Sequence, residues 1–118
     1  MTHTNTLEQV ATTAMAIILP CGEARQLIHQ ALDAAGSGDA ARARELLVDA
    51  KAKSTLGHRA QTTIVQSEAR GEQQIYSVLF THAQDILMTV MSELAIASKL
   101  VDVFERLDER IDALEKRP

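Results

Sequence analysis

Apolar residues recur every three or four positions from about Thr6 to Ala35, the spacing that places side chains on one face of an α-helix. Asn5 or Thr6 is suited to cap its start. The segment predicts a first long helix that ends at Gly36-Ser37-Gly38, where glycine accommodates a left-handed turn. The apolar face consists of Leu7, Val10, Ala14, Ile17, Cys21, Ala24, Ile28, Ala31 and Ala35.

A second helix is predicted from a cap at Asp39 to about Arg70, with Gly71 after it. Polar residues interrupt its apolar face near the middle of the helix, which marks a candidate polar site. The face begins with Ala43, Leu46, Leu47 and Ala50, is interrupted by Ser54, Gly57, His58 and Gln61, and resumes with Ile64 and Val65.

The third helix is predicted from about Ile75 to Lys116, with Ser77 or Gln74 as its cap. Its first half, Val78 to Met91, is apolar nearly all round, so it must be covered on every side. Two partner helices cannot provide that cover, and we expect further copies of the chain to do so. The second half is an ordinary amphipathic helix with inward positions at Ile96, Leu100, Phe104, Leu107, Ile111 and Leu114.

The composition agrees with a single all-α domain over residues 1–118. Hydrophobic residues make up 46% of the 118 but aromatic residues only 3%, so alanine and leucine must do most of the packing. The net charge of −4 argues against nucleic acid as a partner and against an anionic membrane surface. No apolar run approaches the length of a membrane span, the N-terminus lacks a signal-peptide pattern and Cys21 is alone, so we expect a cytoplasmic protein.

Candidate chemistry lies on the third helix, where His82, Asp85 and Thr89 share one face. The residues alone leave two interpretations of His82 open, a functional imidazole or a core histidine bonded to a neighbouring carbonyl or hydroxyl. Asp85 needs a cation, hydrogen-bond donors or a proton if it is buried, and Thr89 is one possible donor. His58 and Gln61 form the second polar patch.

Other enzyme signatures are missing from the sequence. It contains no glycine-rich phosphate loop, no Cys-x-x-Cys and no His-Glu-x-x-His. A metal held within the bundle by His58, His82, Asp85 and Glu68 would lack the Glu-x-x-His repeats of di-iron bundles. Cys21 is better interpreted as a buried structural thiol, because no base stands beside it.

Four strings resemble the lactose/cellobiose-specific IIA family of the bacterial sugar phosphotransferase system, in matching order and separation. The third-helix string is the most specific. The strings are Gly22-Glu23-Ala24-Arg25, His58-Arg59-Ala60-Gln61-Thr62, Glu68-Ala69-Arg70-Gly71-Glu72 and His82-Ala83-Gln84-Asp85-Ile86-Leu87-Met88-Thr89.

This resemblance implies an antiparallel three-helix bundle that assembles as a homotrimer. It implies that His82 accepts a phosphoryl group from the carrier HPr and passes it to a cysteine of the IIB subunit, which serves the membrane subunit IIC. It implies that Asp85 lies near the threefold axis with a metal ion, for which we expect Mg²⁺, and that His58 and Gln61 support the site. The family usually has a second histidine where this chain has Ile86.

The alternative function is a helical adaptor whose apolar third helix mediates oligomerisation without phosphoryl transfer. The sugar would be of the lactose, cellobiose or chitobiose type, because IIA subunits of this family serve such transporters.

Overall fold

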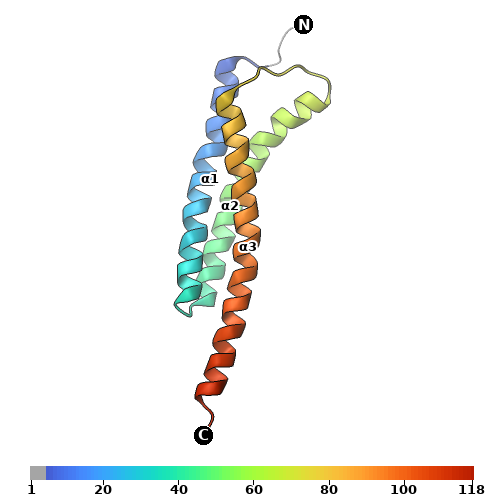
Figure 1. Cartoon of the computed structure of the whole chain (residues 1–118). Helices are drawn as coiled ribbons and strands as arrows, with labels where there is room; N and C mark the ends of the chain where they lie inside the picture. Colours follow the sequence, from blue (N-terminus) through green and yellow to red (C-terminus); the bar gives the residue numbers. More distant parts are fainter. Residues whose placement is uncertain (1–4) are drawn as a thin grey trace.

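Three long α-helices form the molecule in the computed structural model, which describes residues 5–118. They are α1 (Leu7–Gly36), α2 (Ala40–Ala69) and α3 (Val78–Glu115), and no strand occurs among these residues. The chain runs down α1, back up α2 and down α3, so each helix is antiparallel to the next one in sequence (Figure 1). The predicted all-α three-helix bundle is confirmed.

Local polar contacts fix where the helices begin. Thr6 caps α1 in a reciprocal capping box with Gln9, and Asp39 caps α2 by accepting from the Arg42 backbone N–H. Ser77 accepts from the Phe80 N–H, so α3 begins at Val78 rather than at the predicted Ile75.

Both helix ends that precede a turn use the same glycine motif. Gly38 and Gly71 have φ values of 87° and 89°, a region that favours glycine because it has no Cβ. In the first turn the Gly38 N–H donates to Ala35 and the Asp39 N–H to Ala34, and the second turn repeats this pattern. These hydrogen bonds give the backbone carbonyl groups at both helix ends a donor where the chain reverses direction.

Small side chains allow α1 and α2 to approach closely. A Cβ added to Gly57 would lie 2.7 Å from Cys21 Sγ and 3.4 Å from the Ile17 carbonyl oxygen, so no larger residue fits without displacement. Cys21 is buried, as predicted, and burial raises the pKa of its thiol. The core around this contact consists mainly of alanine with Ile17, Ile28, Leu46, Leu47, Leu87, Val90 and Val101.

Less of the surface of α3 is buried than the sequence predicts. Of the six positions expected to face inward, four are exposed: Ile96, Leu107, Ile111 and Leu114. The prediction was wrong at these positions because α1 and α2 pack on the Ala97–Val101 side of α3 and the hairpin ends before α3 does (Figure 1). Val78, Met88 and Met91 are also exposed.

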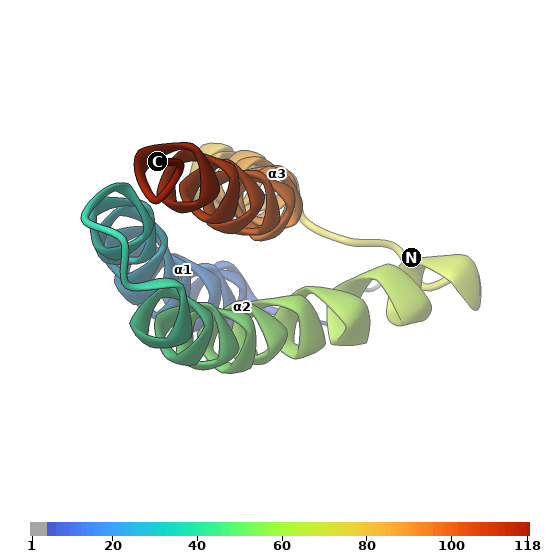
Figure 2. The same cartoon turned by 90° about the horizontal axis from the view of Figure 1, so that it is seen from below.

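The C-terminal turns of α2 diverge from the other two helices, as the end-on view shows (Figure 2). The connection 70–77 then crosses back to α3. Its anchor is Ser67, which is buried and donates to the Glu72 carboxylate while it accepts from Gln74 Nε2 at 2.8 Å. This places the start of α3 beside the start of α1 (Figure 1).

No helix among the described residues is both long enough and apolar enough to cross a membrane.

Candidate functional site

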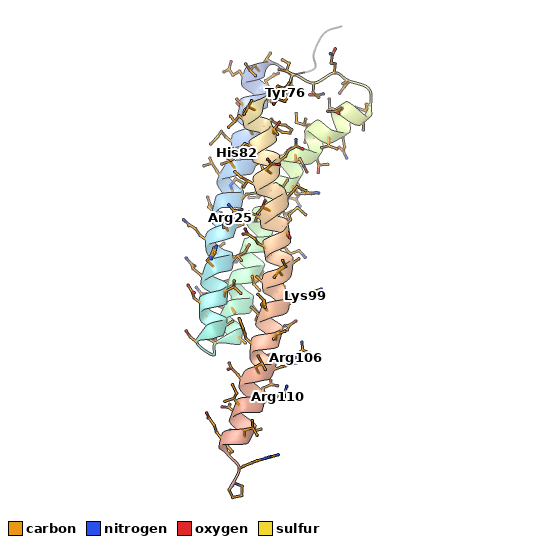
Figure 3. All side chains as sticks on the ribbon, in the orientation of Figure 1. Arg25, Tyr76, His82, Lys99, Arg106 and Arg110 are labelled. Carbon is orange, nitrogen blue, oxygen red and sulfur yellow. The ribbon has the colours of Figure 1, made fainter. Side chains whose placement is uncertain are left out.

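The first turns of α3 present polar side chains outward from an apolar helix. Ala83 and Leu87 are buried against the bundle, so His82 and Asp85, which lie on the other side of the helix, are exposed. Figure 3 shows His82 one turn below the start of α3, at the end of the molecule where Tyr76 lies. His82 is therefore not a core histidine within the single chain, and its imidazole is accessible to a reaction partner.

Asp85 offers a carboxylate with no side-chain partner among residues 5–118. Thr89 does not bond to this carboxylate as the spacing allowed; its Oγ1 donates instead to the Asp85 backbone carbonyl at 2.7 Å. Threonine hydroxyls in helices commonly bond back to the carbonyl four residues earlier. Both carboxylate oxygens of Asp85 remain available as ligands.

His58, one of the two residues of the second predicted patch, lies in a groove between α2 and α3. This groove has a volume of about 370 Å³, and His58 is exposed on it beside buried Ser54. The remaining lining residues are Lys51, Thr55, Met91, Leu94, Ala95 and Ser98. Imidazole, hydroxyl and ammonium groups together offer donors suited to phosphoryl oxygens.

Gln61 contacts α3 directly, because its Nε2 donates to Gln84 Oε1 at 3.1 Å. Gln84 is two residues from His82, so their side chains point roughly 160° apart around the helix. Gln61 and His82 therefore lie at a similar height but on opposite sides of α3 within one chain. The structure brings His58 and Gln61 to one side of α3 and leaves His82 on the other.

The sequence pattern did not identify Gln84 as the partner of Gln61, nor Arg25 as the partner of Glu93, whose charged groups are 3.2 Å apart. Gln84 stands inside the string that carries His82 and Asp85, and that string was the available signal. Arg25 likewise belongs to the Gly-Glu-Ala-Arg string, so both contacts connect α3 to the positions that the resemblance selected.

No three metal-ligating side chains converge within the described part of the chain. A metal held by His58, His82, Asp85 and Glu68 of one subunit thus has no geometric basis here. Oxygen ligands suit a hard divalent cation, and one carboxylate alone is too few for such an ion. Asp85 fits a metal site only where carboxylates from further copies complete it.

Residues 12–105 match the family model described as the lactose/cellobiose-specific IIA subunit of the phosphotransferase system. The chain belongs to this family. The match contains all four site residues, and it makes the protein a phosphotransferase subunit that carries phosphoryl groups for a sugar phosphotransferase system.

Individual relatives agree with the family assignment. The lichenan-specific IIA component of Bacillus subtilis (strain 168) is 36% identical over 103 residues, covering 87% of this chain and 94% of that protein. The lactose-specific component of Lactococcus lactis subsp. lactis is 34% identical over 99 residues, covering 84% and 94%.

Solved structures share the helical bundle of this IIA subunit. The crystal structure of PtcA from S. mutans superposes with a TM-score of 0.84 at 31% identity and covers 86% of this chain and 99% of that one. The cellobiose-specific enzyme IIA from Bacillus anthracis has a TM-score of 0.78 at 38% identity, covering 90% and 94%.

Proposed function

We propose that His82 is the residue that carries the phosphoryl group, received from phospho-HPr and delivered to a cysteine of a IIB subunit. The observation that carries the proposal is an exposed imidazole on α3, at the position where the chain resembles the family acceptor. Exposure is essential, because the same atom must meet two macromolecular partners in turn.

The chemistry requires a nucleophile and little else. One ring nitrogen of His82 attacks phosphorus, a P–N bond forms, and the bond between phosphorus and the donor breaks. In the second half-reaction a IIB thiolate attacks phosphorus, a P–S bond forms, the P–N bond breaks, and His82 is regenerated as the free imidazole. Positioning and charge stabilisation supply most of the catalysis in such transfers, and no separate acid-base pair is needed.

His58 and Gln61 are proposed to support the phosphoryl group from a neighbouring copy of the chain. Within one subunit α3 stands between them and His82, which argues against direct support in cis. In a ring of parallel subunits, however, the flank of α3 that carries His82 faces the α2 side of the next copy. The exposed apolar residues Val78, Met88 and Ile96 favour such a ring, and the family resemblance favours three copies.

Asp85 is proposed to bind Mg²⁺ together with its symmetry mates. It lies on the same exposed face of α3 as Ile96, so three copies would bring three carboxylates to the axis. Like charges this close cannot all ionise without a counterion, and a hard divalent cation would supply one. Its role would be to stabilise the assembly rather than to take part in transfer.

The transported sugar is proposed to be a lactose, cellobiose or chitobiose type, phosphorylated by the IIB and membrane subunits rather than by this one. We also expect the protein to act in the cytoplasm, where HPr and IIB meet it.

The direct test is incubation with phosphoenolpyruvate, enzyme I and HPr, followed by mass spectrometry of the intact chain. One acid-labile phosphate per chain is expected, and later addition of a matching IIB should remove it. A chain that never gains phosphate from phospho-HPr would instead support the helical adaptor.

A further inference from the structure

The middle of α2 is basic in a chain that is acidic as a whole. Residues 50–67 contain three of the 12 Lys and Arg residues and none of the 16 Asp and Glu residues. The formal charge of this stretch is therefore +3, whereas that of the whole chain is −4. A solvated helix surface ordinarily mixes both signs, as the last turns of α3 do, so this stretch differs from the rest of the surface.

Apolar side chains form the centre of this basic stretch on the exposed side of the helix. Val48, Ala52 and Leu56 recur every four residues, and Val48 and Leu56 are 68% and 50% exposed. These three residues line a shallow hollow of about 630 Å³ together with Lys51, Lys53, Thr55 and Arg59. We name these seven residues the basic face. An exposed apolar centre with a charged rim is typical of a surface on which another protein docks.

Two cations of the basic face have no charged partner in their own chain. Lys53 Nζ lies 2.6 Å from Glu23 Oε2, so this carboxylate offsets its charge. The Lys51 and Arg59 side chains are exposed and form no ion pair among residues 5–118. Both groups are therefore available to an anion that approaches from outside.

The basic face adjoins the groove that contains His58. Lys51 and Thr55 line both the hollow and this groove, and Arg59 follows His58 directly in the sequence. Under the proposed function, His58 supports the phosphoryl group on His82 of a neighbouring copy. An anion attracted to the basic face is thereby brought beside the place where that phosphoryl group is received.

We propose that the basic face is the docking surface for phospho-HPr and that it attracts the phosphoryl group which this donor carries. A protein-bound phosphoryl group has a charge of about −1.5 to −2 near neutral pH. Unpaired cations beside a site raise the rate at which such an anion associates with it. The proposal rests on the carrier role given under the proposed function and adds the surface that recognises the donor.

Charge also distinguishes the donor before transfer from the same protein after transfer. Phospho-HPr brings the negative charge to the basic face, whereas HPr leaves without it, so the product is held less tightly than the reactant. A IIB subunit approaches without a phosphoryl group, because the group is then already on this chain. The electrostatic argument therefore favours the donor over the IIB subunit as the occupant of this face.

Arg59→Glu in the full-length chain tests the attraction. The KM for phospho-HPr, taken from initial rates of phosphorylation, should rise about 3- to 10-fold while kcat stays unchanged, because the charge acts on association. Added salt should raise this KM in the wild type and should change it less in the variant. Arg59→Lys should keep the wild-type KM, since it retains the charge.

Arg117→Glu is the matched control. It makes the same change of charge on an exposed residue beyond the C-terminal end of α3, far from the basic face (Figure 1). The KM for phospho-HPr and its salt dependence should stay at the wild-type values. An increase equal to that of Arg59→Glu would overturn the proposal, because the net charge of the chain and not the basic face would then attract the donor.

Inhibition by unphosphorylated HPr shows whether the phosphoryl group itself is recognised. The inhibition constant of HPr should change by about twofold at most in Arg59→Glu, because HPr lacks the added charge. An equal increase for HPr and phospho-HPr would overturn the proposal, since the face would then contact another part of the donor. Slower transfer to IIB with an unchanged KM for phospho-HPr would also overturn it and would assign the face to IIB.

Phosphorylation of the wild-type chain separates this proposal from the proposed function. If phospho-HPr phosphorylates the wild type, and Arg59→Glu has the same KM and salt dependence, the basic face alone is refuted. If the wild type gains no phosphate, the carrier role is refuted and the docking surface with it.

Discussion

At the scale of single residues, we propose separate tasks for two exposed groups in the N-terminal half of α3. The His82 imidazole is exposed, and the Asp85 carboxylate on the neighbouring face has no side-chain partner within residues 5–118. Recognition of both from the sequence depended on the family string, because periodicity placed them on one face but left a core histidine and a Thr89 hydrogen bond open. The exposure of His82 and Asp85 could be known only once α1 and α2 were placed against α3, whereas the Thr89 hydrogen bond lies within α3 and is a common helical contact.

Replacing His82 with Gln should abolish phosphorylation while the helical content stays unchanged, since an exposed side chain contributes little to folding. Replacing His58 with Gln should slow transfer by up to about 100- to 1,000-fold, the usual cost of losing one donor to a developing charge, without abolishing it. His29→Gln, exposed on α1, is the control and should behave as wild type. Phosphate retained by the His82 variant and lost by the His58 variant would reverse the two roles.

If His58 of one subunit supports His82 of its neighbour, an experiment that mixes two variant chains can show it. The His82→Gln and His58→Gln chains, unfolded and refolded together, should form mixed rings in which an intact His82 meets an intact His58 across an interface. Initial transfer rates should then exceed the average of the two separate variants. A rate equal to that average would indicate that each chain supports its own histidine.

Asp85 should account for any stabilisation by Mg²⁺. The wild-type protein should melt at a higher temperature with Mg²⁺ than in chelator, by the equivalent of about 2.7 kcal/mol at a concentration 100 times the dissociation constant. Asp85→Asn should remove that difference. A melting temperature that changes neither with chelator nor with Asp85→Asn would exclude the metal.

At the scale of helices and turns, small residues decide how closely the elements pack. Ser54 and Gly57 appear in the sequence as a polar break in the α2 face, and the structure explains both as places where α2 lies against its neighbours. The caps and glycine turns were predictable because each depends on contacts within a few residues. The divergence of the C-terminal turns of α2 was not predictable, because the periodicity of one helix does not tell how its end packs against the other helices.

Gly57→Ala should destabilise the bundle by about 1–3 kcal/mol, since the new methyl group meets Cys21 Sγ and the core must shift. Gly22→Ala is the matched control: it is also helical, no atom lies within 4 Å of the added Cβ, and it should stabilise by up to about 1 kcal/mol. Urea unfolding of both variants measures the difference. Equal stability of the two would show that α1 and α2 separate easily at this contact.

The connection 70–77 should loosen in acid. The hydrogen bond from Ser67 lowers the pKa of Glu72 below its ordinary value of 4.5, and Arg70 adds to the effect. A lowered native pKa means that the stabilisation is present above pH 4.5 and is lost as the pH falls through the native value. The protection of the amides in residues 70–77, measured against the intrinsic exchange rate at each pH, should therefore fall on acidification in the wild type, whereas Glu72→Gln should lower this protection even at neutral pH.

At the scale of the whole molecule, the single chain is a rod 78 Å long and 21 Å by 19 Å across, with a large exposed apolar face on α3. The sequence predicted that Val78 to Met91 needs more cover than two helices provide, and the exposure of Val78, Met88 and Met91 agrees with that reasoning. The sequence pattern wrongly placed four positions of the C-terminal half of α3 in the core, namely Ile96, Leu107, Ile111 and Leu114. Periodicity identifies an apolar face but does not tell whether the same chain or another one covers it.

Ile96 is the residue that best tests this cover, because it is 57% exposed at the middle of the α3 face and lies within the family match. Ile96→Asp should dissociate the assembly without unfolding the subunit, since it would place a charge from every copy at an apolar seam but leaves the core intact. Val48→Asp, at a position 68% exposed on α2, is the control and should keep the wild-type mass by sedimentation. A wild-type chain that stays monomeric at micromolar concentration, or an Ile96 variant that assembles normally, would mean that the exposed face serves HPr or IIB instead of further copies.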